Sequence, residues 1–185
     1  MGDSTRAFRV GEQATGPLGQ VAHPQHLEHS NRLEEAFYKI GDFAWCYVGN
    51  GLSNQTFIKG AEGIIAIDTG ECHEEMRQAI ERLREETDLP IVACIYTHFH
   101  YVSGTTAITE DRGDDDFPIY GHAGIEANLT RFGGEVGPRG SRGMVHQFAM
   151  MLPDSGPDGL VNIGLGRVYR NPSHVPYTPG HLAAS

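Results

Sequence analysis

Residues 91–104 read IVACIYTHFHYVSG and give the strongest indication of the fold. Its first six residues are apolar and predict a buried strand. His98 and His100 follow the strand directly. Because side chains alternate between the two faces of an extended chain, these two imidazoles point to the same side. The stretch therefore predicts a pair of ligands for a borderline metal such as zinc at the end of a strand.

Three apolar segments before this stretch predict further strands. Turn dipeptides and glycines separate them, and the last segment runs into Asp68-Thr69-Gly70. Short strands joined by short turns favour an antiparallel meander. The three segments cover residues 43–48, 55–59 and 64–67.

The strongest helix signal lies between the meander and the His pair, at residues 74–86. Its apolar residues are spaced at i, i+3, i+4 and i+7, which gives one apolar stripe. Asp88-Leu89-Pro90 ends the helix. A helix between two strands favours a β-α-β arrangement. The stripe consists of Met76, Ala79, Ile80 and Leu83.

After the His pair the sequence alternates between short elements and loops. Residues 104–110 and 123–132 predict helices, and residues 117–120 predict a short strand. Residues 133–143 contain five glycines, one proline and two arginines, which predicts a long loop. Residues 144–152 are apolar enough for a short helix.

Residues 1–30 are polar and contain Gly and Pro at short intervals. This composition predicts an N-terminal arm that packs on another part of the protein. His23, His26 and His29 recur at every third position. A metal-binding tract is one interpretation, but Pro24 argues against a regular helix that presents all three together. We therefore expect a surface arm, followed by one domain over residues 31–185.

The chain has 185 residues and a formal net charge of −10. The length fits one domain, and the charge argues against nucleic acid or an anionic membrane surface as a partner. No apolar run is long enough for a membrane span. Cys46, Cys72 and Cys94 are an odd number without metal-type spacing. We therefore expect free thiols in a reducing compartment, and hence a cytoplasmic protein.

Residues 97–104 resemble the metal-binding signature of the metallo-β-lactamase superfamily, Thr-His-x-His-x-Asp-His-x-Gly. The order of meander, Asp68-Thr69-Gly70, helix, strand and His-x-His is similar to the first half of that fold. Residues 54–58, 65–70 and 118–122 resemble strands of the same superfamily. The resemblance implies an α/β fold, the N-terminal half of an αββα sandwich, with a mixed sheet flanked by helices. The domain over residues 31–185 would then be a partial one.

Three later segments resemble the linker region of one branch of the superfamily, the class III alkylsulfatases. These enzymes hydrolyse alkyl sulfate esters with a dinuclear zinc site. Together the resemblances cover about residues 40–170. The three segments are residues 139–143, 151–153 and 164–166.

The resemblance implies that His98 and His100 are ligands of a first metal. Val102 stands where the signature has the Asp of a second metal site, and Ser103 stands where it has the His. Val102 has no donor atom, and a neutral hydroxyl is a poor zinc ligand. We therefore expect one divalent transition metal and a lost second metal site. Zinc is the first candidate, and Fe or Mn stay open because two histidines do not select the metal.

Other residues receive roles from the same resemblance. Residues 177–181 read YTPGH, which resembles the Thr-Pro-Gly-His segment in which many members of the superfamily carry their next ligand. His181 is therefore the candidate third ligand. Asp68 is expected to orient the His pair by hydrogen bonds. Tyr101 would donate a hydrogen bond into the site or pack beside it. Arg139 and Arg142 would contact the anion of the substrate, because guanidinium groups match sulfate oxygens in pairs.

Two hypotheses for the function follow. The first is a metal-dependent hydrolase, or a subunit of one, that acts on a small anionic ester such as an alkyl sulfate. The second is a non-catalytic subunit or scaffold with the same fold. Alkylsulfatases are longer than this sequence and contain a second αβ half. A half sandwich leaves a sheet face uncovered, so we expect a second polypeptide or a homo-oligomer to complete the fold.

Overall fold

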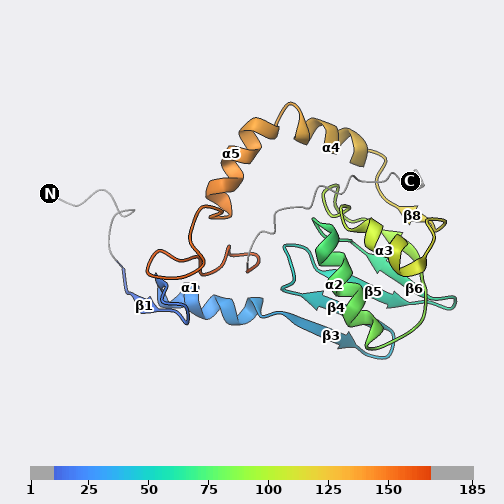
Figure 1. Ribbon diagram of the computed structural model, residues 1–185, viewed down its shortest axis with the longest axis horizontal. Helices are drawn as coiled ribbons and strands as arrows, with labels where there is room; N and C mark the ends of the chain where they lie inside the picture. Colours follow the sequence, from blue (N-terminus) through green and yellow to red (C-terminus); the bar gives the residue numbers. More distant parts are fainter. Residues whose placement is uncertain (1–10, 168–185) are drawn as a thin grey trace.

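The computed structural model describes residues 11–167, which form a larger and a smaller lobe (Figure 1). The larger lobe contains a six-stranded sheet with the order β3-β4-β5-β6-β7-β8. Its strands are β3 (Ala36–Ile40), β4 (Ala44–Val48), β5 (Gln55–Lys59), β6 (Ile64–Ile67), β7 (Ile91–Ile95) and β8 (Ile119–Tyr120). The α-helices are α1 (Pro24–His29), α2 (His73–Arg84), α3 (Thr105–Arg112), α4 (Ile125–Gly133) and α5 (Gly137–Gln147).

The sheet is mixed, as the sequence predicts. Strands β3 to β6 form an antiparallel meander. Helix α2 then crosses over, so that β7 lies parallel to β6, and β8 continues parallel to β7. The sequence did not predict β3. Its last three residues are exposed at the edge of the sheet, so the strand lacks the alternation that marks a half-buried one.

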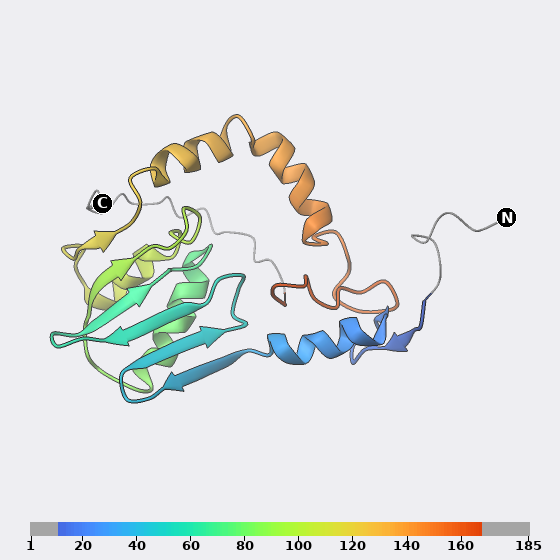
Figure 2. The ribbon, with the colours of Figure 1, turned by 180° about the vertical axis from the view of Figure 1, so that it is seen from behind.

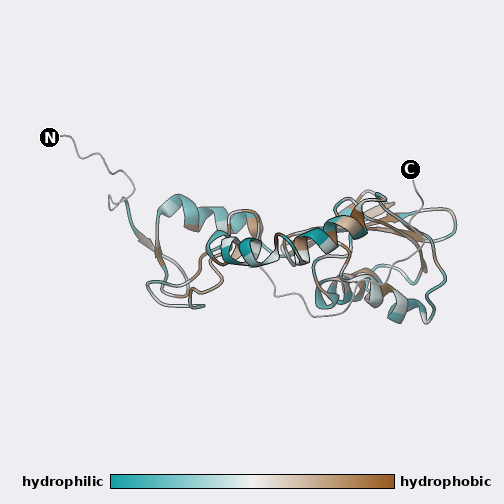
Figure 3. Ribbon diagram, turned by 90° about the horizontal axis from the view of Figure 1, so that it is seen from above, coloured by the Kyte–Doolittle hydropathy of each residue, from teal (hydrophilic) through white to brown (hydrophobic). Residues whose placement is uncertain are grey.

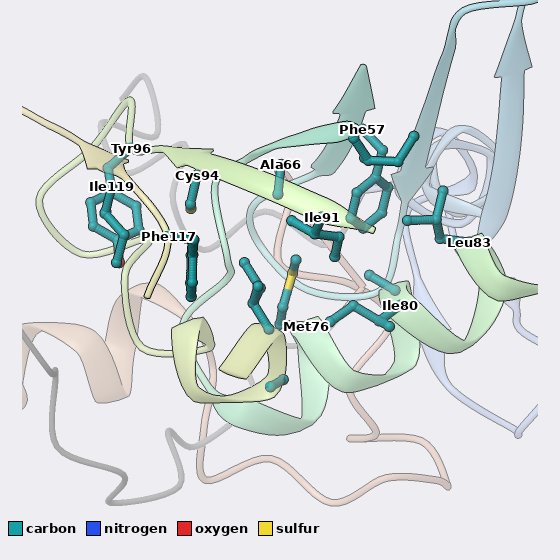
Figure 4. Packing of buried hydrophobic residues seen from close by; sticks show 14 of the residues in the cluster. Phe57, Ala66, Met76, Ile80, Leu83, Ile91, Cys94, Tyr96, Phe117 and Ile119 are labelled. Carbon is teal, nitrogen blue, oxygen red and sulfur yellow. The ribbon is translucent and has the colours of Figure 1, made fainter. Parts of the chain in front are cut away.

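Helices α2 and α3 pack against each other and cover one face of the sheet (Figure 4). The predicted stripe of α2 is buried in this core, which explains why an amphipathic segment between two strands becomes a crossover helix. The largest fully buried apolar side chains come from three strands, β5, β6 and β7, and from the two helices α2 and α3. They include Phe57, Ile64, Met76, Leu83, Ile91 and Ile108.

Two cysteines lie in or beside this core and predict a loss of stability at alkaline pH. Burial raises the pKa of the Cys72 thiol to about 11 and raises the pKa of the Cys94 thiol further still. In the unfolded chain both thiols release their protons near pH 9. The unfolded state therefore binds fewer protons above that pH, and the free energy of unfolding falls as pH rises toward 11.

The expected loss is about 1 kcal/mol for each thiol by pH 10. It is measured by urea unfolding at pH 8 and at pH 10. The control is the double variant Cys72→Ala/Cys94→Ala, which keeps every other titrating group. Equal losses for the wild type and the double variant would contradict the prediction.

The other face of the sheet points away from α2 and α3 (Figure 2). Aligned residues form apolar rows across the strands on this face. The two outer strands place exposed side chains on it, Tyr38 and Ile40 on β3 and Tyr120 on β8. The central strands contribute the half-buried Ile58, Ile65, Ile67 and Ile95. A face of this composition is typical of a layer that packs against a second one.

The smaller lobe joins the N-terminal arm to residues 153–167. Strands β1 (Ala14–Thr15) and β2 (Val21–Ala22) form a hairpin, followed by α1 and a 3-10 turn, η2 (Ser30–Leu33). The buried Asn162 fastens the two segments, because its amide donates to the carbonyl of His26 and to the hydroxyl of Ser30. The arm thus packs on a segment that lies more than 130 residues later.

Two expectations for local structure are wrong. Pro24 does not prevent a helix but begins one, because the first turn has no hydrogen bond for its missing N–H to donate. Residues 133–143 do not form a long loop, because α4 ends at Gly133 and α5 begins at Gly137. Pro138 fits the first turn of α5 for the same reason as Pro24 fits α1.

Helices α4 and α5 form an arch that leads from β8 to the smaller lobe (Figure 1). Viewed from above, the molecule is long, and the strands of the larger lobe are its most hydrophobic part (Figure 3). Between residues 11 and 167, no helix has the length and apolar character to cross a bilayer.

Candidate functional site

The His pair lies at the carboxyl end of β7, in a loop of residues 97–104 that we call the His loop. The turn between β6 and α2, residues 68–72, lies at the same edge of the sheet because β6 and β7 are parallel. The Asp68 N–H donates to the carbonyl of Ile95 and joins the two segments at a distance of 2.8 Å. The candidate site is built from these two loops.

Asp68 holds the beginning of the His loop. Its carboxylate accepts from the backbone N–H of Thr97 at 2.7 Å and from the Thr97 hydroxyl at 2.5 Å. Asp68 has a φ of 60°, an uncommon conformation for a residue other than glycine. This backbone turns the carboxylate of the first residue after β6 toward the neighbouring loop. The Asp68 carboxylate thus fixes Thr97, the residue directly before the His pair.

The middle of the His loop is fastened to the same turn through the backbone. Thr69 donates to the carbonyl of Tyr101 from both its N–H, at 3.0 Å, and its hydroxyl, at 3.1 Å. The Ser103 N–H donates to the carbonyl of Gly70 at 3.3 Å. Thr105, the first residue of α3, donates from its hydroxyl to the carbonyl of Val102 at 2.8 Å. These bonds fix the path of the loop without any group from outside the chain.

The rings of His98 and His100 lie near each other, with 5.8 Å between their centroids. The ring of Tyr101 contacts both imidazoles, and its centroid lies 4.6 Å from that of His98 and 4.3 Å from that of His100. Phe99 contacts His100 from another side, at 5.0 Å. The side chain of His100 is 39% exposed, so this ring can meet solvent or a ligand. Aromatic neighbours therefore restrict both imidazoles.

Tyr101 is a neutral hydrogen-bond donor at physiological pH. Burial raises its pKa above the ordinary value of 10, and the carboxylates of Glu71, Asp68 and Glu75 raise it further. The phenolate would carry a negative charge beside these carboxylates, which makes ionisation unfavourable.

Glu71 is a residue of this site that the sequence did not reveal. It is only 7% exposed, and its Oε1 lies 3.3 Å from His100 Nδ1. Its backbone N–H donates to the buried carboxylate of Glu75 at 2.9 Å, which fixes the turn. The signal available in the sequence was the acidic residue directly after Asp68-Thr69-Gly70. Only the parallel pairing of β6 and β7 brings it to the His loop.

Val102 and Ser103, the two signature positions whose side chains are not metal-type donors, have structural roles. Val102 is 1% exposed and belongs to the hydrophobic core with Met76 and Ile108. Ser103 uses its backbone to hold the loop. The side chain at position 102 thus points into the core of the larger lobe, where a carboxylate would be buried.

The described residues do not fit a complete metal site. No group of three or more His, Cys, Asp or Glu side chains in residues 11–167 is arranged to hold a metal ion. His98 and His100 bring two imidazoles together, whereas zinc sites in proteins use three or four protein ligands. The candidate third ligand His181 lies outside the described residues.

A small pocket lies beside His98, with a volume of about 250 Å³. Its lining includes His122, which follows β8, and Asn128 of α4. His122 Nδ1 accepts the backbone N–H of Gly124 at 3.0 Å, so the ring has a structural partner at the start of α4. The lining combines these polar side chains with the apolar Phe99 and Ile125.

Arg139 and Arg142 lie on α5, and both are exposed. The sequence placed them in a loop, whereas they are one turn apart on a helix of the arch (Figure 1). Residues three apart on a helix share a face, so the two guanidinium groups can act on one anion.

Comparisons with known proteins were made by sequence and by structure. No family model matches the chain. A linear primary-alkylsulfatase from a Pseudomonas species is 31% identical over 113 residues, which is 59% of this chain and 21% of the relative. The chain therefore spans about a fifth of the curated relative it matches.

Solved structures give a consistent result for the fold. The stereoselective inverting sec-alkylsulfatase Pisa1 from Pseudomonas sp. matches with a TM-score of 0.66 and 22% identity, over 78% of this chain and 23% of that one. A double mutant of the sec-alkyl sulfatase PisA1 matches with a TM-score of 0.63 and 20% identity, over 86% of this chain and 30% of that one. The predictions of the α/β fold class and of an alkylsulfatase-like partial domain are confirmed.

Proposed function

Because the chain is similar to alkylsulfatases in sequence and in fold, we propose that it is part of a hydrolase for small anionic esters such as alkyl sulfates. The similarity to linear primary-alkylsulfatase over 113 residues carries this proposal. The chain would supply one αβ layer and the His loop. His98 and His100 would be its contribution to the reacting centre, since both lie at the sheet edge with restricted rings.

The proposal includes at most one divalent transition metal at the His loop. Zinc suits imidazole ligands best, with Fe or Mn as alternatives. Residues 102 and 103 would contribute no ligand, because Val102 is buried in the core. The remaining ligands would come from beyond residues 11–167, with His181 as the candidate in this chain. Two imidazoles alone do not fix a metal, so no chemical step is assigned to one.

Arg139 and Arg142 would bind the sulfate group of the substrate. Guanidinium groups pair with sulfate oxygens through two parallel hydrogen bonds. Their exposure on one face of α5 supports this role, since neither guanidinium is buried.

A non-catalytic subunit is the second candidate function. The observation that favours it is the burial of Val102, which turns a ligand position of the signature into a core position. In that case the fold would be kept for assembly with a partner, and the His loop would be a structural connection between the two loops of the sheet edge.

Metal content and activity distinguish the two functions. For the hydrolase we expect up to one equivalent of transition metal in the purified chain, and a loss of most of it in His98→Ala and in His100→Ala. Octyl sulfate, with and without a candidate partner chain, is the substrate for the activity measurement. His146→Ala is the control, because this histidine lies on α5 and is remote from the signature. Trace metal that neither substitution changes, together with no sulfate release, would support the non-catalytic subunit.

We also propose that a second polypeptide or a second copy covers the apolar face formed by β3 to β8. Tyr38, Ile40 and Tyr120 are between 45% and 54% exposed on or at the ends of this face. The relatives are several times longer than the part that this chain matches, which supports a further layer on this face. A cytoplasmic location is proposed from the cysteines, which are free thiols in the described residues.

A further inference from the structure

A further cavity lies in the smaller lobe, between the N-terminal arm and residues 153–167, and its volume is about 570 Å³. Sites for small organic molecules in proteins typically have volumes of roughly 300–1,000 Å³. The lining comes from two segments that are far apart in the sequence, and it shares no residue with the His loop. The cavity is therefore a candidate binding site that is separate from the sheet edge of the larger lobe.

Hydrogen bonds between the two segments fix the walls of this cavity. The N–H of Gly156 donates to the carbonyl of Leu18 at 2.9 Å. The buried side chain of Gln20 accepts from the N–H of Leu18 and donates to the carbonyl of Leu160, both at 3.0 Å. The cavity is thus preformed, and a ligand would not have to order its walls.

One part of the lining is apolar. Leu27 of α1 and the neighbouring pair Leu160 and Val161 are half-buried, and Leu18 is 59% exposed. An apolar side chain of a ligand that lies against these residues would be removed from water together with them, which is favourable.

Three exposed charged side chains, Glu34, Asp154 and Arg167, line the same cavity. Although both signs of charge are present, within residues 11–167 none of the three forms an ion pair or a hydrogen bond through its side chain. The hydroxyl of Ser30 accepts from the amide of Asn162, which leaves its own proton for a ligand. The lining therefore offers one cationic group, two anionic groups and a neutral donor.

We propose that this cavity binds a short zwitterionic peptide with apolar side chains. The free carboxylate of the peptide would pair with the guanidinium of Arg167 through two parallel hydrogen bonds. Its free ammonium would bind the carboxylates of Glu34 and Asp154. A purely anionic ligand would meet two uncompensated carboxylates, and a purely cationic ligand would leave the guanidinium without a partner. The inference goes beyond the proposed hydrolase and does not depend on it.

The test is isothermal titration calorimetry of the full chain with leucyl-leucine at neutral pH and low salt. N-acetyl-leucyl-leucine lacks the ammonium group, and leucyl-leucinamide lacks the carboxylate. We expect the free dipeptide to bind more tightly than either derivative by about tenfold or more, because each derivative loses a charge-assisted hydrogen bond.

Substitutions in the cavity should remove these preferences one at a time. In Arg167→Gln, the dipeptide and its amide should bind equally well. In the double variant Glu34→Gln/Asp154→Asn, the dipeptide and its N-acetyl derivative should bind equally well. Arg131→Gln is the matched control, because it removes an exposed guanidinium on α4 that does not line the cavity. Both preferences should persist in this control.

A wild-type chain that does not bind leucyl-leucine at millimolar concentration would overturn the proposal. So would equal binding of the three peptides, or preferences that the cavity variants leave unchanged. The three charged residues are exposed, so neutral side chains of the same shape should not unfold the chain. If a variant fails to fold, the wild-type comparison of the three peptides decides. A chain that binds the dipeptide but releases no sulfate from an alkyl sulfate would refute the hydrolase alone.

Discussion

Val102→Asp, which moves the His loop one residue closer to the superfamily signature, should strongly destabilise the chain instead of creating a second metal site. Val102 is 1% exposed and packs in the core of the larger lobe. A carboxylate at this position would be buried among apolar side chains, and a buried charge without a partner costs about 3–5 kcal/mol. That loss is a large part of the 5–15 kcal/mol that stabilises a typical domain.

The measurement is urea unfolding of wild type and variant, each with and without added zinc. Ser103→Asp is the matched control, because it adds the same charge at the next residue, which is only half-buried. We expect the control to lose about 1 kcal/mol or less. A Val102→Asp chain that is as stable as the wild type and binds additional zinc would show that position 102 faces a metal site.

Gly104→Ala should have the second largest effect, and it should act on the His loop directly. A Cβ atom at Gly104 would lie 2.0 Å from the carbonyl oxygen of Thr69 and 2.5 Å from the Cβ of Met76. Neither atom belongs to the end of a flexible side chain, so the loop or α2 must move. Overpacking of this kind costs about 1–3 kcal/mol, and backbone contact places the expected loss at about 3 kcal/mol or more.

The displacement should also break the bonds between Thr69 and Tyr101, so backbone hydrogen exchange in residues 97–104 should become faster. Gly143→Ala is the control, because no atom lies within 4 Å of its added Cβ and it is inside helix α5. Alanine favours a helix, so the control should be neutral or slightly stabilised. Equal stability of Gly104→Ala and Gly143→Ala would contradict the close contact.

Periodicity made much of the larger lobe predictable. The segments at 55–59 and 64–67 coincide with β5 and β6, because their side chains alternate and glycines end them. The stripe of α2 follows from its spacing in the same way. Edge strand β3 and helix α5 were not predictable by these rules. Strand β3 buries neither face fully, and α5 contains glycines that usually mark loops.

Only those features of the candidate site that depend on residues close together in the sequence were predictable. His98 and His100 follow one strand, so their placement at the end of β7 needed no tertiary information. Glu71 lies in the turn between β6 and α2, whereas His100 lies in the His loop after β7. The spacing of residues in the sequence does not predict a contact between two separate loops, so the contact of Glu71 with His100 was not predictable. The absence of donors at Val102 and Ser103 was visible in the sequence. The burial of Val102 was not, because it depends on how α3 packs against α2.

The way in which Asn162 joins the smaller lobe has a consequence for the folding pathway. Its bonds to His26 and Ser30 close a loop of more than 130 residues. The entropy cost of such a closure favours contacts that are nearer in sequence, and the larger lobe from β3 to β8 consists of them. The sheet and the His loop should therefore form first and the smaller lobe last. The arm is then the part of the chain whose contacts open first when the protein is stressed.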